Sequence, residues 1–228
     1  MESYYTLMRY IDDIVDGDAP LEEGFKNSEE FVLDKIRFAE NPINPKDKVD
    51  YLMLYCLEIG EKFGQNFSSE IQDILSSMLF DARRYRKQQI FSEKGLQHHF
   101  HLLDVRGTIS ATLKVFGEDP SKYPLLEPLG FATRIYYNLR DYDEDIRAGL
   151  VNVSAEDCDK FGIMNLEDRL SKPVQDWMKD QAQQGLNLIK EHREILPQAN
   201  LGILARLTLP VVYEKPSKKY FEQVLQSI

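Results

Sequence analysis

Cysteine is scarce in this chain of 228 residues, which contains only Cys56 and Cys158. Two cysteines cannot build a disulfide framework, and their separation matches no spacing of a metal-binding motif. The sequence is therefore unlike the small secreted domains that disulfide bonds hold together. This cysteine usage is typical of a reducing compartment, so we expect a cytoplasmic protein.

Positive charge is also in short supply. The chain carries 28 Lys and Arg residues against 38 Asp and Glu residues, which gives a formal net charge of -10 and a pI near 5.0. Proteins that bind the phosphate backbone of nucleic acid or the surface of an anionic membrane usually carry an excess of basic residues. The composition thus predicts no nucleic-acid partner. A diphosphate can still bind where acidic side chains first gather divalent cations that reverse the local charge.

Long apolar runs are missing as well. The longest, Leu201–Val212, is interrupted by Arg206 and is shorter than the ~20 residues that a membrane-spanning helix needs. No charged segment followed by an apolar one opens the chain, so we expect no signal peptide. The sequence predicts no transmembrane segment, whereas peripheral association with a membrane that holds an apolar substrate stays open.

The two-residue alternation of β-strands is rare, and apolar residues recur instead at intervals of three and four, as at Ile71, Ile74 and Met78. This pattern predicts an all-α protein. The hydrophobic content of 43% is enough for one domain, 1–228, with a sizeable core. The ranges predicted to be helical are Ser3–Asp16, Ser28–Glu40, Lys46–Phe63, Ser68–Gln89, Lys94–Phe116, Pro124–Ile146, Leu166–His192, Ala199–Val212 and Ser217–Ile228.

A first acidic motif ends the first predicted helix. Asp12 and Asp16 are four residues apart, so their side chains lie on one face of that helix, one turn from each other. Gly17 follows directly, which places both acids in the last turn, where the helix dipole disfavours negative charge. A divalent cation held by the two carboxylates would offset this cost.

A second motif repeats the arrangement in the other half of the chain. Asp141 and Asp145 are again four residues apart near a predicted helix end, and Gly149 closes the segment. If the two motifs face each other across a helical bundle, their carboxylates can bind several Mg²⁺ ions around a diphosphate. Arg9 and Arg140, which adjoin the motifs, would donate hydrogen bonds to phosphate oxygens.

These residues resemble those of the squalene and phytoene synthases, the head-to-head trans-isoprenyl diphosphate synthases. The stretch Arg9–Asp18 is similar to the first aspartate-rich motif of that family. Leu139–Asp145 is similar to the second, whose core is Arg-Asp-x-x-Glu-Asp. Between them, Val105–Ile109 resembles the Val-Ala-Gly-x-Val stretch of a helix that lines the family's pocket. The three motifs occur in the family order across nearly the whole chain.

The resemblance implies an isoprenoid synthase-type helical bundle around a central apolar cavity. It also implies that Mg²⁺, with Mn²⁺ as an alternative ion, assists the ionisation of an isoprenyl diphosphate. In the family reaction two prenyl diphosphates join; squalene formation then requires NADPH and phytoene formation does not, so the use of NADPH stays open. The residues implied to bind metal and act in catalysis are Asp12, Asp16, Asp141 and Asp145. The residues expected to bind substrate are Arg9, Arg140, Tyr137, Val105 and Thr108, with the ring of Tyr137 facing a carbocation.

The sequence also departs from the family. Tyr137 occupies the place of an asparagine metal ligand, Arg106 replaces a small residue, and Leu150 and Asn152 replace an arginine and a tyrosine. The chain begins almost at the first motif, so the family's preceding helix is expected to be missing. Two alternatives therefore stay open: a terpene cyclase or a prenyltransferase to another acceptor, and a non-catalytic binding or assembly protein. Chain length, product and oligomeric state are not predicted.

Two other groups of polar residues are interpreted as surface features. The histidines His98, His99 and His101 lie close together but lack nearby acids or cysteines in the spacing of a metal site. The basic run Arg83–Lys87 has the composition of a solvated helix face.

Overall fold

The computed structural model describes residues 2–227 and confirms the all-α prediction, because the regular structure in that range is entirely helical. Ile228, which ends the last predicted helix, lies outside the described residues. The helices are, in chain order, α1 (Glu2–Val15), α2 (Ser28–Glu40), α3 (Lys48–Lys62), α4 (Ser68–Arg84), α5 (Glu93–Phe100), the π-helix η1 (His101–Ile109), α6 (Ser110–Val115), the 3-10 helix η2 (Pro120–Leu126), α7 (Glu127–Arg140), α8 (Tyr142–Ala148), α9 (Ala155–Phe161), α10 (Lys172–Ile195), the 3-10 helix η3 (Leu196–Ala199), α11 (Ile203–Leu209), the π-helix η4 (Pro210–Glu214) and α12 (Lys215–Ser227).

Several boundaries differ from the predicted helices, and two of these differences bear on the acidic motifs. The helix predicted for Ser68–Gln89 ends with α4, because Tyr85 is extended (φ -48°, ψ 129°) and Arg86 has a positive φ of 60°. The helix predicted for Pro124–Ile146 is interrupted at Asp141, whose ψ of 9° is not helical. The second acidic motif therefore lies at a junction between α7 and α8 rather than within one long helix.

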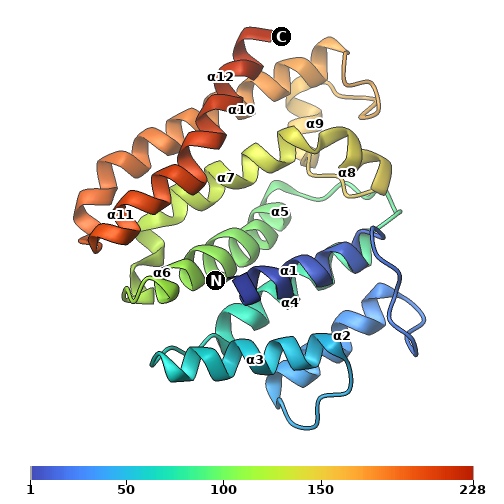
Figure 1. The fold of residues 1–228 in the computed structure, drawn as a ribbon. Helices are drawn as coiled ribbons and strands as arrows, with labels where there is room; N and C mark the ends of the chain where they lie inside the picture. The colour runs from blue at the N-terminus through green and yellow to red at the C-terminus, as the bar shows by residue number, and fades with distance from the viewer. Residues whose placement is uncertain (1, 228) are drawn as a thin grey trace.

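The helices form two groups on either side of the α5–η1–α6 segment (Figure 1). Helices α1 to α4 pack around a hydrophobic cluster that includes Ile11, Phe31 and Met53. Helices α7 to α10 and α12 share a second cluster, which includes Leu139 and Trp177. A smaller third cluster joins η1, α6, η2 and α11. The described contacts thus connect the two groups through the middle segment, and the assignment of one domain, 1–228, stays a prediction.

Glycine allows η1 to approach both groups closely. A Cβ atom on Gly107 of η1 would lie 2.4 Å from a side-chain carbon of Ile74 on α4. A Cβ atom on Gly130 of α7 would lie 2.9 Å from a side-chain carbon of Val105 on η1. The hydroxyl of Tyr4 on α1 donates a hydrogen bond of 2.9 Å to the carbonyl of Gly107. Because η1 contacts α1, α4 and α7, its side chains lie between the two motif-bearing halves of the chain.

Candidate active site

Three chain turns meet at one end of the molecule and bring the acidic motifs together. Gly17, directly after α1, is so near the hydroxyl of Tyr85 that a Cβ atom on the glycine would lie 2.3 Å from that oxygen. The next residue, Arg86, donates its backbone N–H to the carbonyl of Ala148 at the end of α8, at 2.7 Å. The segment that follows α4 therefore contacts the ends of both motif-bearing helices, α1 and α8.

Gly149 is central to this junction, and we expect Gly149→Ala to lower the free energy of unfolding by about 3 kcal/mol. Its φ is 79°, and an added Cβ would lie 2.8 Å from the Cα atom of Arg86. Gly162, which follows α9, is the matched control because its φ is 69° and nothing lies within 4 Å of its Cβ position. Gly162→Ala should cost only about 1 kcal/mol, from the left-handed backbone. Urea titrations compare the two, and equal costs would contradict the close contact at Gly149.

The first motif lies at the end of α1, as its spacing predicted. Asp16 donates its backbone N–H to the carbonyl of Asp12 at 2.9 Å, so the two side chains are one helical turn apart. The guanidinium of Arg9 lies 3.1 Å from the carboxylate of Asp12 and 2.8 Å from that of Asp13. Arg9 therefore neutralises part of the charge of its own motif.

The second motif lies where α7 ends and α8 begins. Asp145 donates its backbone N–H to the carbonyl of Asp141 at 2.9 Å, which preserves the one-turn separation across the junction. Arg140 makes two hydrogen bonds to the carboxylate of Asp141, both of 2.6 Å. The side-chain amide of Asn152 donates to the carboxylate of Asp145 at 2.9 Å and orients it. Each motif thus places its own arginine against its carboxylates, Arg9 against Asp12 and Asp13 and Arg140 against Asp141.

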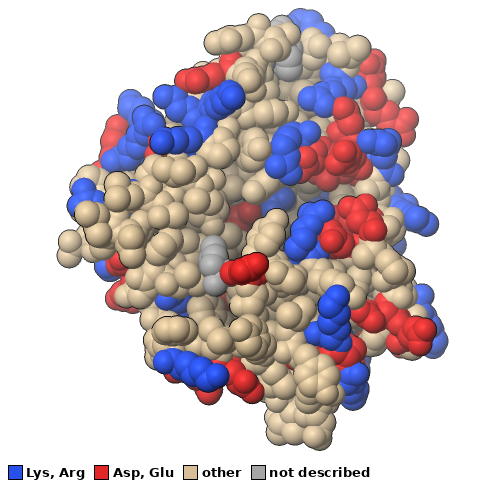
Figure 2. Space-filling view, viewed as in Figure 1, with Lys and Arg blue, Asp and Glu red and all other residues tan. Residues whose placement is uncertain are grey.

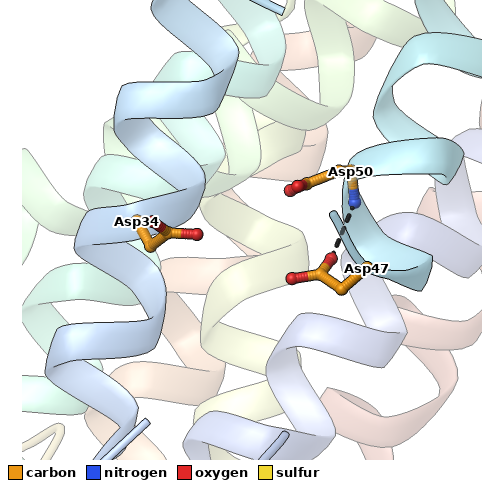
Figure 3. A group of neighbouring side chains, drawn as sticks. All are labelled: Asp34, Asp47 and Asp50. Atoms are coloured by element: carbon orange, nitrogen blue, oxygen red, sulfur yellow. Dashed lines mark hydrogen bonds between the residues drawn. The ribbon is translucent and has the colours of Figure 1, made fainter. Parts of the chain in front are cut away.

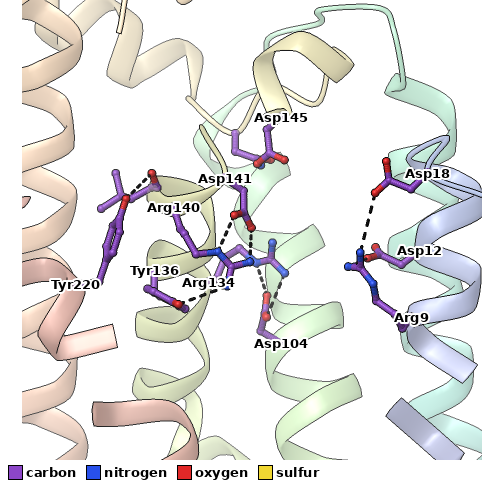
Figure 4. Close-up of polar contacts among 12 residues, drawn as sticks. Arg9, Asp12, Asp18, Asp104, Arg134, Tyr136, Arg140, Asp141, Asp145 and Tyr220 are labelled. Atoms are coloured by element: carbon purple, nitrogen blue, oxygen red, sulfur yellow. Dashed lines mark hydrogen bonds and ion pairs between the residues drawn. The ribbon is translucent and has the colours of Figure 1, made fainter. Parts of the chain in front are cut away.

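The two motifs face each other (Figure 4). Burial raises the pKa of Asp16 to about 8, and the negative charges of Asp12 and, from the second motif, Asp145 add to this increase. Burial raises the pKa of Asp12 to about 6, with a further contribution from Asp81. Burial also raises the pKa of Asp145 to about 7, and the charge of Asp141 adds to it. The carboxylates of α1 and α8 therefore share one electrostatic environment.

A largely buried ion pair lies beside these carboxylates. Arg134 on α7 donates to the carboxylate of Asp104 on η1, at 2.7 and 3.2 Å. Burial lowers the pKa of Arg134, but the charges of Asp104, Asp81 and Asp145 raise it more, so the pKa is above its ordinary value. The guanidinium of Arg134 in turn offsets part of the increase that burial causes in the pKa of Asp12 and Asp145. Arg134 is therefore a fixed cation among the acids of both motifs.

Asp81 on α4 belongs to a polar network beneath the motifs. Its carboxylate accepts a hydrogen bond of 2.7 Å from Arg84 and lies 3.3 Å from Nε2 of His99. The Nδ1 atom of His99 lies 2.9 Å from the hydroxyl of Ser77. Burial lowers the pKa of His99 to about 4, so the ring is neutral at pH 7. Arg84 also donates to Asn152 at 2.8 Å and so links this network to the second motif.

The sequence did not reveal these central residues. The interpretation of His99 as a surface residue is wrong, because its exposed fraction is 2%. Arg84 is also only 2% exposed, although it belongs to the run interpreted as a solvated face. One signal was present: Arg84 follows Asp81 by three residues, a spacing at which side chains meet on a helix. No local signal pairs Asp104 with Arg134, which are 30 residues apart.

The other residues expected to bind substrate lie on α7 and η1. Tyr137 is half-buried on α7, and its ring centroid is 5.8 Å from the guanidinium carbon of Arg134 and 4.7 Å from that of Arg140. Val105 is fully buried on η1. Thr108, on the same helix, donates its hydroxyl to a backbone carbonyl five residues earlier, at 2.8 Å. Tyr137 thus adjoins the arginines, whereas Val105 and Thr108 shape η1.

A pocket of about 410 Å³ lies at the opposite end of α1 from the acids. Tyr4 and Cys56 contribute to its wall from α1 and α3, and Phe67 and Lys114 from the start of α4 and from α6. The acids of the two motifs are not among the residues that line it. This pocket is therefore separate from the junction of α1 and α8.

A second group of acids, Asp34, Asp47 and Asp50, brings carboxylate oxygens within 4.8 Å of one another (Figure 3). The buried ammonium of Lys35 already occupies this group: it lies 3.1 Å from Asp34 and 2.8 Å from Asp50, and it also contacts Asp47. Within residues 2–227 no other three such ligands are as close together. Each ion at the motifs would thus be bound by only one or two carboxylates, with water or substrate oxygens as its further ligands.

The motif residues suit Mg²⁺ in chemical type. Carboxylate oxygens are the ligands that Mg²⁺ prefers, and it commonly takes one or two of them together with phosphate oxygens. Carboxylates that raise one another's pKa are also the groups whose repulsion a divalent cation relieves. The donor set and its electrostatics therefore fit the metal that the resemblance implies.

We expect the stability of the protein in EDTA to fall by roughly 1–2 kcal/mol between pH 6.5 and pH 8. Acids with a raised folded-state pKa stabilise the fold below their unfolded pKa of 3.8, and this contribution is lost as the pH rises through the folded values, about 7 for Asp145 and about 8 for Asp16. The window begins at pH 6.5 because His99, whose folded pKa is about 4, has the opposite effect at lower pH.

Urea titrations at both pH values measure this loss. Mg²⁺ should restore stability at pH 8, and Asp16→Asn should flatten the dependence on pH. A slope in Asp16→Asn equal to that of the parent protein would show that the pKa of Asp16 is not raised in the folded protein.

No protein-family model matches this sequence, and no curated protein matches it. The structure, in contrast, is similar to the crystal structure of squalene synthase HpnC from Alicyclobacillus acidocaldarius, with a TM-score of 0.70 at 15% sequence identity. The similarity covers 98% of this chain and 81% of that protein. At this level of identity the likeness shows the fold alone. The chain therefore has a squalene/phytoene synthase-like fold, an all-α bundle of the isoprenoid synthase type.

Proposed function

We propose that this protein is a Mg²⁺-dependent synthase that ionises isoprenyl diphosphates and joins two of them head to head. The observation that supports the proposal is that the two motifs, from opposite halves of the chain, face each other (Figure 4), so that the charge of Asp145 adds to the raised pKa of Asp16. Carboxylates in that state are destabilised by repulsion and are stabilised by divalent cations. The squalene synthase-like fold supports the same class of reaction.

In this proposal the ions are held by Asp12, Asp16, Asp141 and Asp145. Bound Mg²⁺, or Mn²⁺ in its place, would supply the positive charge that neutralises a departing diphosphate. Arg140 now holds a carboxylate with two hydrogen bonds, and a guanidinium binds phosphate with the same geometry. Arg9 is likewise bound only by neighbouring acids on a half-exposed surface. Both arginines can therefore exchange a carboxylate for phosphate oxygens once the acids bind metal.

The carbocation that ionisation produces needs a negative or aromatic environment. The ring of Tyr137 adjoins the second motif and would provide an aromatic face. Arg134 and Arg140 lie near that ring, so their charges oppose a second cation there. We therefore expect the diphosphate to stay bound beside the carbocation and compensate these charges until the new carbon–carbon bond forms.

Purified protein incubated with Mg²⁺ and farnesyl or geranylgeranyl diphosphate tests the proposal. We expect release of diphosphate and a C30 or C40 hydrocarbon, measured by mass spectrometry with and without NADPH. EDTA should abolish the release. If these substrates and geranyl diphosphate are neither bound nor converted, the proposal is wrong.

A second candidate is cyclisation, or prenyl transfer to another acceptor, after the same ionisation step. It is favoured by the Arg134–Asp104 ion pair, because a charged pair beside the acids suits a polar acceptor better than a second prenyl chain. A C15 or C20 product, or a prenylated small molecule, would support this candidate.

A non-catalytic binding or assembly protein remains the third reading of the sequence. Calorimetry with Mg²⁺ and a non-hydrolysable prenyl diphosphate separates it from both enzymes. A protein of that kind should show no metal-dependent binding, whereas either enzyme should bind the analogue only when Mg²⁺ is present.

A further inference from the structure

Helix α11 is apolar on two opposite faces. Ala205 and Leu209 are fully buried against the third hydrophobic cluster. On the outer face, the exposed fractions are 74% for Ile203, 65% for Leu204 and 64% for Leu207. A surface helix normally carries polar residues on its outer face, so an outer apolar face indicates a partner.

The outer apolar face continues beyond α11. Val211 and Val212 on η4 are 52% and 51% exposed. Ile203, Leu207 and Val211 are spaced by four residues and therefore form a stripe along one side of the helix. We call the five exposed residues Ile203, Leu204, Leu207, Val211 and Val212 the α11 face.

Basic residues adjoin the α11 face. Arg206, Lys215 and Lys219 are exposed and Lys218 is half-exposed. Two acids lie in residues 203–222: Glu214 is buried and paired with Arg193, and Glu222 lies 3.7 Å from Lys218, so the excess of positive charge comes from Arg206, Lys215 and Lys219. The side of the molecule that carries α11 and the start of α12 is largely uncharged in the space-filling view, with charged side chains of both signs at its margins (Figure 2). This local excess of positive charge contrasts with the net charge of -10 for the whole chain.

We propose that the α11 face docks on the surface of an anionic lipid bilayer. The five aliphatic side chains enter the boundary between headgroups and acyl chains, and the neighbouring Lys and Arg side chains contact headgroup phosphates. The protein lies on the bilayer rather than across it: among residues 2–227, no helix combines the length and the apolarity of a membrane span.

Charge favours a bilayer over a second copy of the chain. In a two-fold symmetric dimer each copy contributes the same surface, so the basic residues around one α11 face would adjoin those around the other. Basic residues brought together in this way would repel one another, whereas anionic headgroups attract basic residues. The combination of exposed aliphatic and basic residues therefore fits a membrane better than a self-interface.

Flotation of the full chain with lipid vesicles tests this inference. We expect binding to vesicles of phosphatidylcholine mixed with phosphatidylglycerol, and much weaker binding to phosphatidylcholine alone. EDTA is included so that metal cannot link the acidic motifs to lipid phosphates. Leu204→Glu/Leu207→Glu should reduce the partition coefficient at least about tenfold, because two inserted side chains are lost. Lys215→Gln/Lys219→Gln should reduce it about tenfold on anionic vesicles only.

Met164→Glu/Leu170→Glu is the matched control. Met164 and Leu170 are 97% and 80% exposed, but they lie near the start of α10, at the other end of that helix from α11. This variant should bind vesicles like the parent protein. If Met164→Glu/Leu170→Glu loses as much vesicle binding as Leu204→Glu/Leu207→Glu, the inference is overturned. A dimer in lipid-free solution, seen by light scattering, that Leu204→Glu/Leu207→Glu disrupts while the parent binds no vesicles would also overturn it. The assay contains no prenyl substrate, so its outcome is independent of the proposed function.

Discussion

Asp16→Asn and Asp145→Asn are each expected to reduce Mg²⁺-dependent release of diphosphate by at least about a thousandfold, because each removes a carboxylate that positions the metal. The folded protein in EDTA should be as stable as the parent, or more stable. Burial raises the pKa of Asp16 to about 8 and that of Asp145 to about 7, and repulsion from Asp12 and Asp141, respectively, adds to these increases. Removing one charge relieves that repulsion in the absence of metal. The same two measurements apply to Asp12→Asn and Asp141→Asn.

Asp176→Asn is the control for these variants. Asp176 is a half-exposed acid on α10 that pairs with Lys172 one turn away and is not among the charges that shift the pKa of Asp12, Asp16 or Asp145. It should retain activity and stability. If Asp16→Asn or Asp145→Asn instead unfolds the protein in EDTA, that acid is a structural partner of a buried arginine, and the shared metal site is wrong for that residue.

Lys35→Met is expected to lower the free energy of unfolding by about 3–5 kcal/mol, the usual cost of removing one partner from a buried ion pair. The ammonium of Lys35 is fully buried and contacts three carboxylates from α2 and the start of α3. Without it, Asp34, Asp47 and Asp50 face one another with no cation between them (Figure 3). The rings of Phe25 and Phe31, 5.5 Å from the ammonium, cannot replace its charge.

Lys62→Met, at an exposed position on α3, serves as the control and should change stability by less than about 0.5 kcal/mol. The double variant Lys35→Met/Asp50→Asn should recover part of the loss, because it removes one of the repelling carboxylates. A loss in Lys35→Met no larger than in Lys62→Met, measured by urea titration, would show that this ion cluster does not stabilise the fold.

The acidic motifs were predictable because their signals are local. The separation of Asp12 from Asp16 fixes their common helix face through backbone geometry alone. Gly17 and Gly149 marked where the helices end, and both adopt the positive φ that favours glycine there. The prediction that the second motif lies within one helix was less accurate, since the break at Asp141 has no proline or glycine to mark it.

The centre of the site was not predictable in the same way. Asp104 and Arg134 form their ion pair where Gly130 of α7 allows that helix to pack closely against Asp104 and Val105 of η1. His99 looked like a surface residue beside two other histidines, yet its packing against α4 buries it next to Asp81. Neither pairing leaves a trace in residue spacing, because the partners come from different helices.

The sequence by itself determined the all-α fold and the two carboxylate pairs, since helical periodicity and four-residue spacing depend only on neighbours within about one turn. The tertiary structure decided that the pairs share one environment. The contacts of Tyr85 and Arg86 with the ends of α1 and α8 bring together acids that are more than a hundred residues apart, and burial there raises their pKa values. The positive local charge around α11 was likewise not evident from the net charge of -10, because composition sums the charges of the whole chain. A docking surface depends instead on which side chains the fold places side by side.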